Sequence, residues 1–177
     1  MPETTAHLAG RLASDGERTL AFFQQLTPEQ WERCIYPAEE LPERTSASGK
    51  EATWSAHQIL AHIVSAEASF MRLIGDIAAG GSGAPIDFNI DSFNNKEVTH
   101  FQVRSRIDLL NQFAQLRQAN ARLVAQLDDN DLVKTGRHPY LGMAPLADII
   151  KLVYRHNQIH LRDIRQVTSD LTGDQNR

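Results

Sequence analysis

Apolar residues recur every three or four positions in four long segments of the chain, at about residues 5–26, 55–79, 96–127 and 145–168. This spacing is typical of amphipathic helices, and no stretch predicts a strand. Four helices of about 20 to 30 residues around one apolar core favour an all-α fold, a four-helix bundle. We expect a single domain whose core extends from about residue 5 to residue 168.

Capping and breaking residues mark the ends of these helices. Thr27 and Pro28 predict a break after the first helix and a short new helical start. Ser55 and Gln58 form a capping box at the start of the second helix, which the glycine-rich residues 80–85 end. Loops are expected at three segments rich in Pro, Gly, Ser, Asp or Asn, namely 37–53, 86–95 and 128–143.

The third segment carries an unusually wide apolar arc. Its apolar residues fall on two neighbouring lines: Val103, Ile107, Leu110 and Ala114 on one, and Leu109, Phe113, Leu116 and Leu123 on the other. A stripe this wide predicts contacts on two sides, one with the core and one with a second copy of the chain. We therefore expect a homodimer with two-fold symmetry.

Composition and charge narrow the class of protein. The 177 residues are 41% hydrophobic and 23% charged, and the net charge is −4. Because no basic excess is present, nucleic acid and anionic membranes are not expected as partners. No signal peptide or membrane span is predicted, so we expect a cytoplasmic protein. The one cysteine, Cys34, cannot form an internal disulfide and is expected to be inert.

Two histidines lie on the apolar face of the fourth helix. Ile149 and Val153 lead into His156 and His160, and Val167 continues the same face. Buried imidazoles need partners for both ring nitrogens, and two histidines one turn apart can bind one metal ion. The alternative is a pair of core histidines that backbone groups or water satisfy.

A third histidine on another helix favours the metal site. His62 lies on the apolar face of the second helix, whereas His57, in the first turn, is expected to face solvent. Three neutral imidazoles and a water molecule form an open site of the kind found in catalytic centres, and Zn²⁺ and Ni²⁺ are the most suitable ions. The axial levels of His62 and of the His156/His160 pair agree to about 5 Å if their helices are antiparallel, against about 9 Å if they are parallel. Antiparallel packing predicts an up-down-down-up bundle with a crossover between helices two and three.

Two motifs carry a resemblance to a known family. WSAHQILAHIVSAE (54–67) and HNQIHLRDI (156–164) resemble the W-S-x-x-x-x-L-x-H-x-x-x-x-E and H-x-x-x-H-x-x-x-I patterns of the DinB/YfiT-like superfamily. GRHPYLGMAPLADII (136–150) and IDFNIDSFNN (86–95) are also similar to segments of that family. The resemblance implies an up-down-down-up bundle, three metal-binding histidines at His62, His156 and His160, and often a dimer. It also implies, for some members, S-transferase or isomerase activity with bacillithiol, mycothiol or glutathione.

Residues that would assist the three histidines or contact a substrate are harder to assign. Glu67 and Asp163 are candidates for catalytic or histidine-orienting roles, but a solvated Glu67 is favoured and Asp163 is equally consistent with a surface salt bridge. Asp91, Asn94 and Arg137 are candidates for contact with substrate, although turn-forming and solvated roles explain them too. The same holds for Arg155 and Arg162.

Three hypotheses for function remain open. The first is a metal-dependent enzyme, either a hydrolase or a thiol-dependent S-transferase, that acts on a small molecule. The second is a metal-binding or interaction protein without catalysis, because no acid/base pair stands beside the histidines in the sequence. The third is a bundle without metal, in which the histidines are core polar groups.

Overall fold

The computed structural model describes residues 3–37 and 53–172. Its helices are α1 (Thr5–Gln24), α2 (Pro28–Glu32), α3 (Ala56–Ala78), α4 (Ile90–Phe101), α5 (Arg106–Ala125) and α6 (Leu146–Thr168), with short 3₁₀ helices η2 (Asp129–Val133) and η3 (Ser169–Thr172). The predicted capping box of Ser55 and Gln58 is present at α3, and a second one, of Thr27 and Gln30, opens α2. Local capping chemistry therefore determines where these helices begin.

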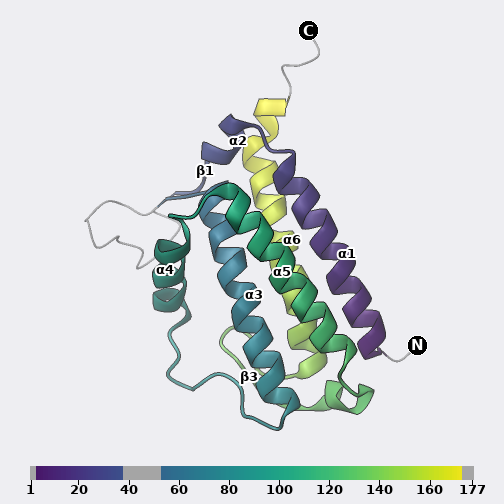
Figure 1. Cartoon of the computed structure of the whole chain (residues 1–177). Coiled ribbons are helices and arrows are strands. Elements are labelled where there is room, and N and C mark those ends of the chain that lie inside the picture. The colour runs from purple at the N-terminus through teal and green to yellow at the C-terminus, as the bar shows by residue number, and fades with distance from the viewer. Residues whose placement is uncertain (1–2, 38–52, 173–177) are drawn as a thin grey trace.

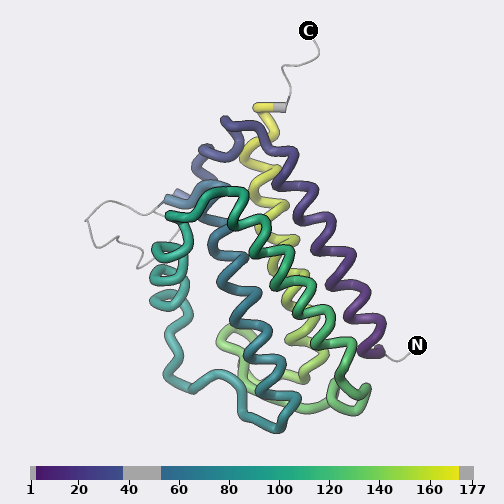
Figure 2. Tube along the Cα trace, viewed as in Figure 1, coloured from purple at the N-terminus to yellow at the C-terminus, as the bar shows by residue number. Residues whose placement is uncertain are grey.

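The long helices form an up-down-down-up bundle, as the sequence predicts. Helices α1 and α6 run towards one end of the molecule, and α3 and α5 run towards the other (Figure 1). Each long helix packs against two others: α5 contacts α1 and α3, and α6 contacts α1 and α3. The chain returns between α3 and α5 along the outside of the bundle, and α4 lies in this crossover (Figure 2). The antiparallel packing of α3 and α6 is confirmed.

The expectation that the chain has no strand is wrong. Two short antiparallel pairs are present: β1 (Cys34–Tyr36) with β2 (Trp54–Ser55), and β3 (Thr135–His138) with β4 (Gly142–Pro145). Both pairs lie in or beside segments predicted as loops. The sequence did not predict them because strands of two to four residues are too short to produce a periodic pattern. The part of the 37–53 loop between residues 38 and 52 lies outside the described residues.

The single helix expected over residues 96–127 is also wrong. The chain breaks between α4 and α5, where Ser105 adopts an extended backbone and its side chain accepts a hydrogen bond from the Asp108 N–H. Helix α4 begins earlier than expected, at a cap formed by Asn89, so most of the segment predicted to be an irregular loop is helical. The break separates Val103 from Ile107, which the pattern placed on one line of the apolar arc, and they are 83% and 70% exposed.

One of the two lines of the apolar arc in the third segment is covered within one chain. Leu109 and Phe113 are fully buried, and Leu116 and Leu123 pack against the hydrophobic core. A second copy is therefore not needed to cover these side chains. The homodimer stays a prediction.

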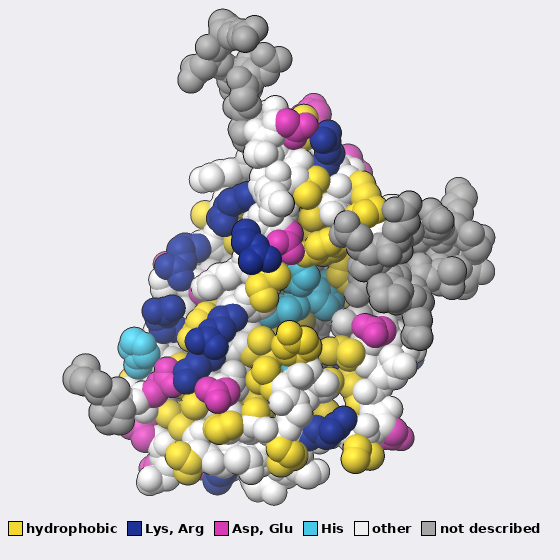
Figure 3. Space-filling view, turned by 180° about the vertical axis from the view of Figure 1, so that it is seen from behind, with side chains coloured by type: hydrophobic (Ala, Val, Ile, Leu, Met, Phe, Trp, Pro, Cys, Tyr) yellow, Lys and Arg dark blue, Asp and Glu magenta, His cyan; other side chains and the backbone are white. Residues whose placement is uncertain are grey.

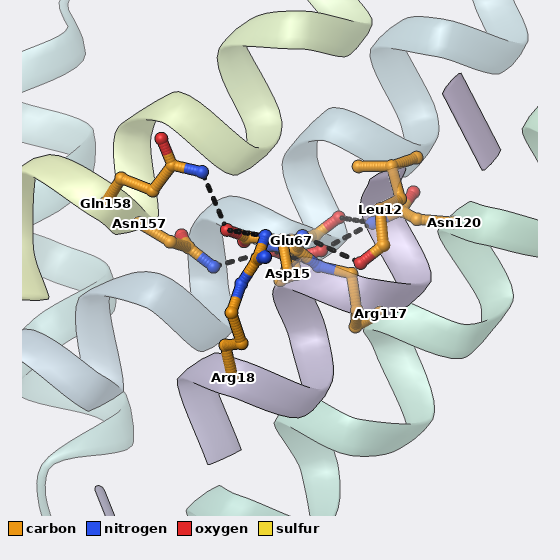
Figure 4. A network of polar contacts seen from close by, with 8 residues as sticks. All are labelled: Leu12, Asp15, Arg18, Glu67, Arg117, Asn120, Asn157 and Gln158. Atoms are coloured by element: carbon orange, nitrogen blue, oxygen red, sulfur yellow. Dashed lines mark hydrogen bonds and ion pairs between the residues drawn. The ribbon is translucent and has the colours of Figure 1, made fainter. Parts of the chain in front are cut away.

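A buried polar network divides the core into two hydrophobic clusters. Phe23, Leu60 and Phe113 belong to the cluster near the β1–β2 end, whereas Leu12 and Ile149 belong to the other. Between them, the guanidinium of Arg117 lies 2.5 Å from Glu67 Oε1 and 3.2 Å from Asp15 Oδ2 (Figure 4). The side chains of Arg117, Glu67 and Asp15 are all less than 5% exposed.

The carboxylate of Glu67 also receives hydrogen bonds from asparagines on α5 and α6. Asn120 Nδ2, on α5, donates to Oε2 at 2.8 Å, and Asn157 Nδ2, on α6, lies 3.5 Å from Oε1. Burial raises the pKa of Glu67, and Arg117 with the two asparagines opposes that rise. Charge pairing and hydrogen bonding thus compensate the loss of water around this group.

The crossover is hydrogen-bonded to the β3–β4 hairpin. The Arg137 N–H donates to Ser82 O and the Ala84 N–H donates to Arg137 O, both at 2.8 Å. Gly83, between them, has φ of +82°, and a Cβ at this position would lie 2.4 Å from Arg137 O. Glycine is therefore required both for the backbone conformation and for the close approach of the two segments.

No helix in the described part of the chain is long and apolar enough to cross a lipid bilayer. The absence of a membrane partner and the cytoplasmic location stay predictions.

We predict that Arg117→Ala lowers the free energy of unfolding by about 3 to 5 kcal/mol, because it leaves two buried carboxylates without their cation. Arg33→Ala is the matched control: it breaks the ion pair with Asp170, in which the two side chains are 44% and 58% exposed, and should cost less than about 1 kcal/mol. Urea unfolding followed by circular dichroism measures both. Equal losses in the two variants would contradict a structural role for the buried network.

Candidate metal centre

Three histidines from two helices meet at one point. His62 is on α3, and His156 and His160 are on consecutive turns of α6. His156 Nε2 lies 2.9 Å from His62 Nε2 and 3.1 Å from His160 Nε2. The potential ligand atoms of all three residues lie within 4.8 Å of one another. The structure therefore brings together the three side chains that the sequence predicts as ligands.

The spacing of these nitrogens fits a bound divalent ion. Three ligands arranged tetrahedrally about one ion, at the 2.0–2.1 Å typical of zinc and imidazole, are separated from one another by about 3.3 Å. The two observed Nε2 separations lie within about 0.4 Å of that value. Convergence of three nitrogens of the same kind is the arrangement that an open three-histidine site requires.

A hydrogen-bonded chain holds the His160 ring in the tautomer of a ligand. Tyr36 donates its hydroxyl proton to Asp163 Oδ2 at 2.7 Å, and its oxygen lies 2.9 Å from His160 Nδ1. Because the only hydroxyl proton is directed at the carboxylate, the oxygen accepts from Nδ1–H of His160. The lone pair of His160 is then on Nε2, which faces the other two histidines. Such partners orient metal-binding histidines and increase their basicity.

His156 is held neutral by its surroundings. Burial of the ring lowers the pKa of His156 to about 4, and a hydrogen bond with the Asn157 side chain opposes that shift. A neutral imidazole keeps a lone pair for a metal ion at pH 7. Because Asn157 also contacts Glu67, the metal centre adjoins the buried polar network.

The three histidines face a cavity of about 830 Å³. Figure 3 shows histidine side chains in a hollow that hydrophobic side chains surround. Helix α4 and the crossover form one wall, with Phe88, Ile90 and Phe93, and the opposite side carries Phe70 of α3 and Ile159 of α6. The open side of the histidine cluster is thus the floor of a largely apolar chamber, which is typical of small-molecule sites.

Comparison with known proteins concerns the family and the fold of the chain. The sequence profile of the DinB superfamily matches residues 11–164. The chain belongs to the DinB superfamily. A similar solved structure is YfiT from Bacillus subtilis, described as a probable metal-dependent hydrolase with an unusual four-helix bundle topology; it is 14% identical, with a TM-score of 0.67 over 92% of this chain and 87% of that one. No curated protein matches the sequence.

Within this DinB-superfamily chain, the other predicted helper residues take different positions. Glu67 is not solvated, as had been favoured, but 1% exposed, and its carboxylate faces Arg117 instead of the cavity. Asp163 contacts the metal centre indirectly, through Tyr36, and also pairs with Arg162. Both interpretations of Asp163 are therefore realised at once.

The residues proposed to contact substrate are mostly placed elsewhere. Asp91 and Asn94 are in α4 and not in a loop, and of the two only Asn94 lines the cavity. Arg137 donates to the carbonyls of Pro85 and Ile86 and so anchors the crossover. Arg155 and Arg162 are exposed, and so is Cys34.

His57 is not solvent-exposed as expected. Its Nε2 lies 2.8 Å from the carbonyl oxygen of Gln102, and its ring packs edge-on against Trp31. The side chain therefore links the first turn of α3 to the break between α4 and α5, which comes much later in the sequence.

Three residues of the site were missed by the sequence interpretation. Tyr36 and Trp54 enter from the β1–β2 pair, and Trp54 packs on His62 with ring centres 5.1 Å apart. His138, in the β3–β4 hairpin, lines the same cavity and stacks on Phe70. Pro139 and Gly142, which follow His138 in the sequence, did give a signal, but that signal indicates a turn and not a site.

We predict that Tyr36→Phe weakens the binding of Zn²⁺ by about 10- to 100-fold, because His160 loses the acceptor that holds its Nδ1–H. Tyr140→Phe is the control, since Tyr140 lines the cavity but is 79% exposed. Competition with a chelating dye measures both affinities. Unchanged affinity in the Tyr36 variant would show that the chain from Asp163 to His160 has no part in metal binding.

We also predict that the metal-free protein loses stability as the pH falls from 7 to 5. Burial lowers the pKa of both His156 and His138 to about 4 in the folded protein, against about 6.5 for an unburied histidine. Between these values the unfolded chain binds protons that the folded chain does not, so the free energy of unfolding falls by up to about 2 kcal/mol for each histidine at pH 5.

Urea midpoints at the two pH values test this prediction. His156→Gln should reduce the pH dependence, and His7→Gln, which alters an exposed residue of α1, should leave it unchanged. A wild-type midpoint that is the same at pH 7 and pH 5 would show that these histidines are not held neutral by folding.

Proposed function

We propose that the protein is a divalent-metal-dependent hydrolase of small, largely apolar molecules, with His62, His156 and His160 as the metal ligands. The convergence of three Nε2 atoms on the floor of a cavity is the observation that carries this proposal. Neutral imidazole ligands suit Zn²⁺ or Ni²⁺. Membership of the DinB superfamily and likeness in fold to a probable metal-dependent hydrolase support it.

The metal ion and the side chains of the protein have different roles in the proposed reaction. A divalent ion held by three histidines supplies Lewis acidity and lowers the pKa of a water molecule towards neutrality. Tyr36 and Asp163 keep the Nε2 lone pair of His160 available. The aromatic side chains of the cavity wall exclude bulk water and hold an apolar substrate over the histidines.

The lining of the cavity favours hydrolysis over thiol transfer. Arg72 is the only lysine or arginine among the described residues that line it, and Asp76 is the only carboxylate. Glutathione, mycothiol and bacillithiol are polar molecules that carry charged groups, and an apolar wall offers few partners for them. A thiol-dependent S-transferase is therefore the less favoured form of the proposed enzyme.

The second candidate function is metal binding without catalysis. No carboxylate in the described part of the cavity wall lies beside the histidines: Asp76 is fourteen residues after His62, about 21 Å farther along α3. Glu67 is engaged by Arg117 and its Oε atoms are turned into the core. A hydrolase of this kind would rely on the ion, without a protein carboxylate as general base.

We predict that purified protein binds one Zn²⁺ or Ni²⁺ per chain and that His156→Ala abolishes stoichiometric binding without loss of helix. Four long helices bury enough apolar surface to fold without a metal ion, and two remaining ligands hold an ion poorly. His7→Ala, an exposed substitution on α1, is the control. Elemental analysis and circular dichroism are measured on the same samples.

Activity is then tested with 4-nitrophenyl acetate and 4-nitrophenyl butyrate, and separately with glutathione and 1-chloro-2,4-dinitrobenzene. Ester hydrolysis that disappears with the metal in His156→Ala supports the hydrolase. Turnover only with the thiol would support the transferase, and stoichiometric metal without turnover of either kind would support the non-catalytic protein. Loss of helix together with metal would show that the ion is structural.

A further inference from the structure

His138 has one ring nitrogen fully occupied by the turn in which it lies. The residue ends β3, and its Nδ1 is 3.1 Å from the backbone nitrogen of Tyr140 and 3.3 Å from that of Leu141. Both backbone groups are N–H donors, so Nδ1 must be the acceptor. The proton of the neutral imidazole is then on Nε2, at the opposite edge of the ring.

The surroundings of the ring keep it neutral and immobile. His138 is 7% exposed, and its ring lies nearly parallel to that of Phe70, with centres 5.6 Å apart. Burial lowers its pKa to about 4, so the Nε2–H donor is present throughout the neutral pH range. A side chain fixed by two backbone N–H groups and an aromatic stack has little rotamer freedom left to lose on binding.

His138, which carries this donor, lines the proposed substrate cavity. His138 lines this cavity together with aromatic residues, among them Trp54, Phe88, Phe93 and Tyr140. Within the described part of the chain, the hydrogen bonds of the His138 ring are those of Nδ1, and Nε2 has no protein acceptor. A nearly buried donor in an apolar wall is costly unless a ligand supplies an acceptor, and such a donor discriminates strongly against ligands that lack one.

His138 and the metal centre both contact the same phenylalanine. The Phe70 ring stacks on His138 and makes an edge contact with His156, with ring centres 6.2 Å apart. Because His138, Phe70 and the three histidines line one cavity, one ligand in that cavity can contact His138 while it lies beside the histidines. Because a single neutral donor cannot balance a charge, an uncharged carbonyl group is the acceptor that best suits it.

We propose that His138 is a specificity-determining residue, whose Nε2–H binds the carbonyl oxygen of an uncharged, ring-bearing ligand in the cavity. This inference rests on the proposed function only in taking the same cavity as the substrate site. Its test uses metal-free protein, so failure of metal binding or of hydrolysis leaves the result intact. Conversely, a hydrolase that binds its substrate without this hydrogen bond would overturn only the role of His138.

The test compares two probes of nearly equal shape, 2-acetylnaphthalene and 2-ethylnaphthalene, which differ in the presence of a carbonyl oxygen. Binding to metal-free protein is followed by changes in amide chemical shifts. We expect the ketone to bind about tenfold more tightly than the hydrocarbon. Equal affinities, or no binding of either probe near its solubility limit, would overturn the proposal.

Two variants separate the role of Nε2 as a donor to the ligand from the role of Nδ1 as an acceptor within the turn. In His138→Asn, the amide oxygen replaces Nδ1 as acceptor for the Tyr140 and Leu141 N–H groups, but no donor reaches the position of Nε2. In His138→Gln, the longer amide places an N–H near that position and lacks the acceptor for the turn. The preference for the ketone should disappear in His138→Asn, with the amide shifts of Tyr140 and Leu141 retained, and persist in His138→Gln.

The tautomer supplies a readout that does not depend on any ligand. A long-range ¹H–¹⁵N correlation spectrum of the histidine rings at pH 7 should show His138 protonated at Nε2. Protonation at Nδ1 would overturn the assignment, and so would a ketone preference that survives in His138→Asn.

Discussion

The contact between Arg117 and Glu67 determines how the four long helices meet. One guanidinium on α5 binds carboxylates from α1 and α3, and the α3 carboxylate also receives hydrogen bonds from asparagines on α5 and α6. Hydrophobic contacts tolerate sliding of one helix along another, whereas these directional contacts are satisfied at only one axial position. Gly16 permits the approach, since a Cβ there would lie 2.5 Å from Arg117 Cγ.

This position of the helices is also the one that assembles the histidines. Glu67 is five residues after His62 on α3, and Asn157 directly follows His156 on α6. The Asn157 side chain lies 3.5 Å from Glu67, and on the same two helices the Nε2 atoms of His62 and His156 lie 2.9 Å apart. The metal centre thus depends on a charge pair that does not touch it.

The fold and the clustering of the three histidines were predictable from the sequence because each depends on local patterns. Helical spacing identified the four long helices, and an imidazole on an apolar stripe is conspicuous at His62, His156 and His160. Glu67 was misjudged because its partner Arg117 is fifty residues away, and Tyr36 was missed because His160 is 124 positions farther along. The break at Ser105 was missed because apolar residues continue through it and a serine cap is a weaker signal than a proline or glycine.

Substitutions in the bundle and substitutions in the crossover are expected to have different consequences. The three clustered histidines are on α3 and α6, inside the bundle, while Phe88, Ile90 and Phe93 enter the cavity from a crossover that Gly83 and Arg137 fasten to the hairpin. Substitutions in the crossover alter the shape of the chamber without disturbing the charge pair or the histidines. An architecture of this kind allows the shape of the cavity to change while the histidine cluster stays the same.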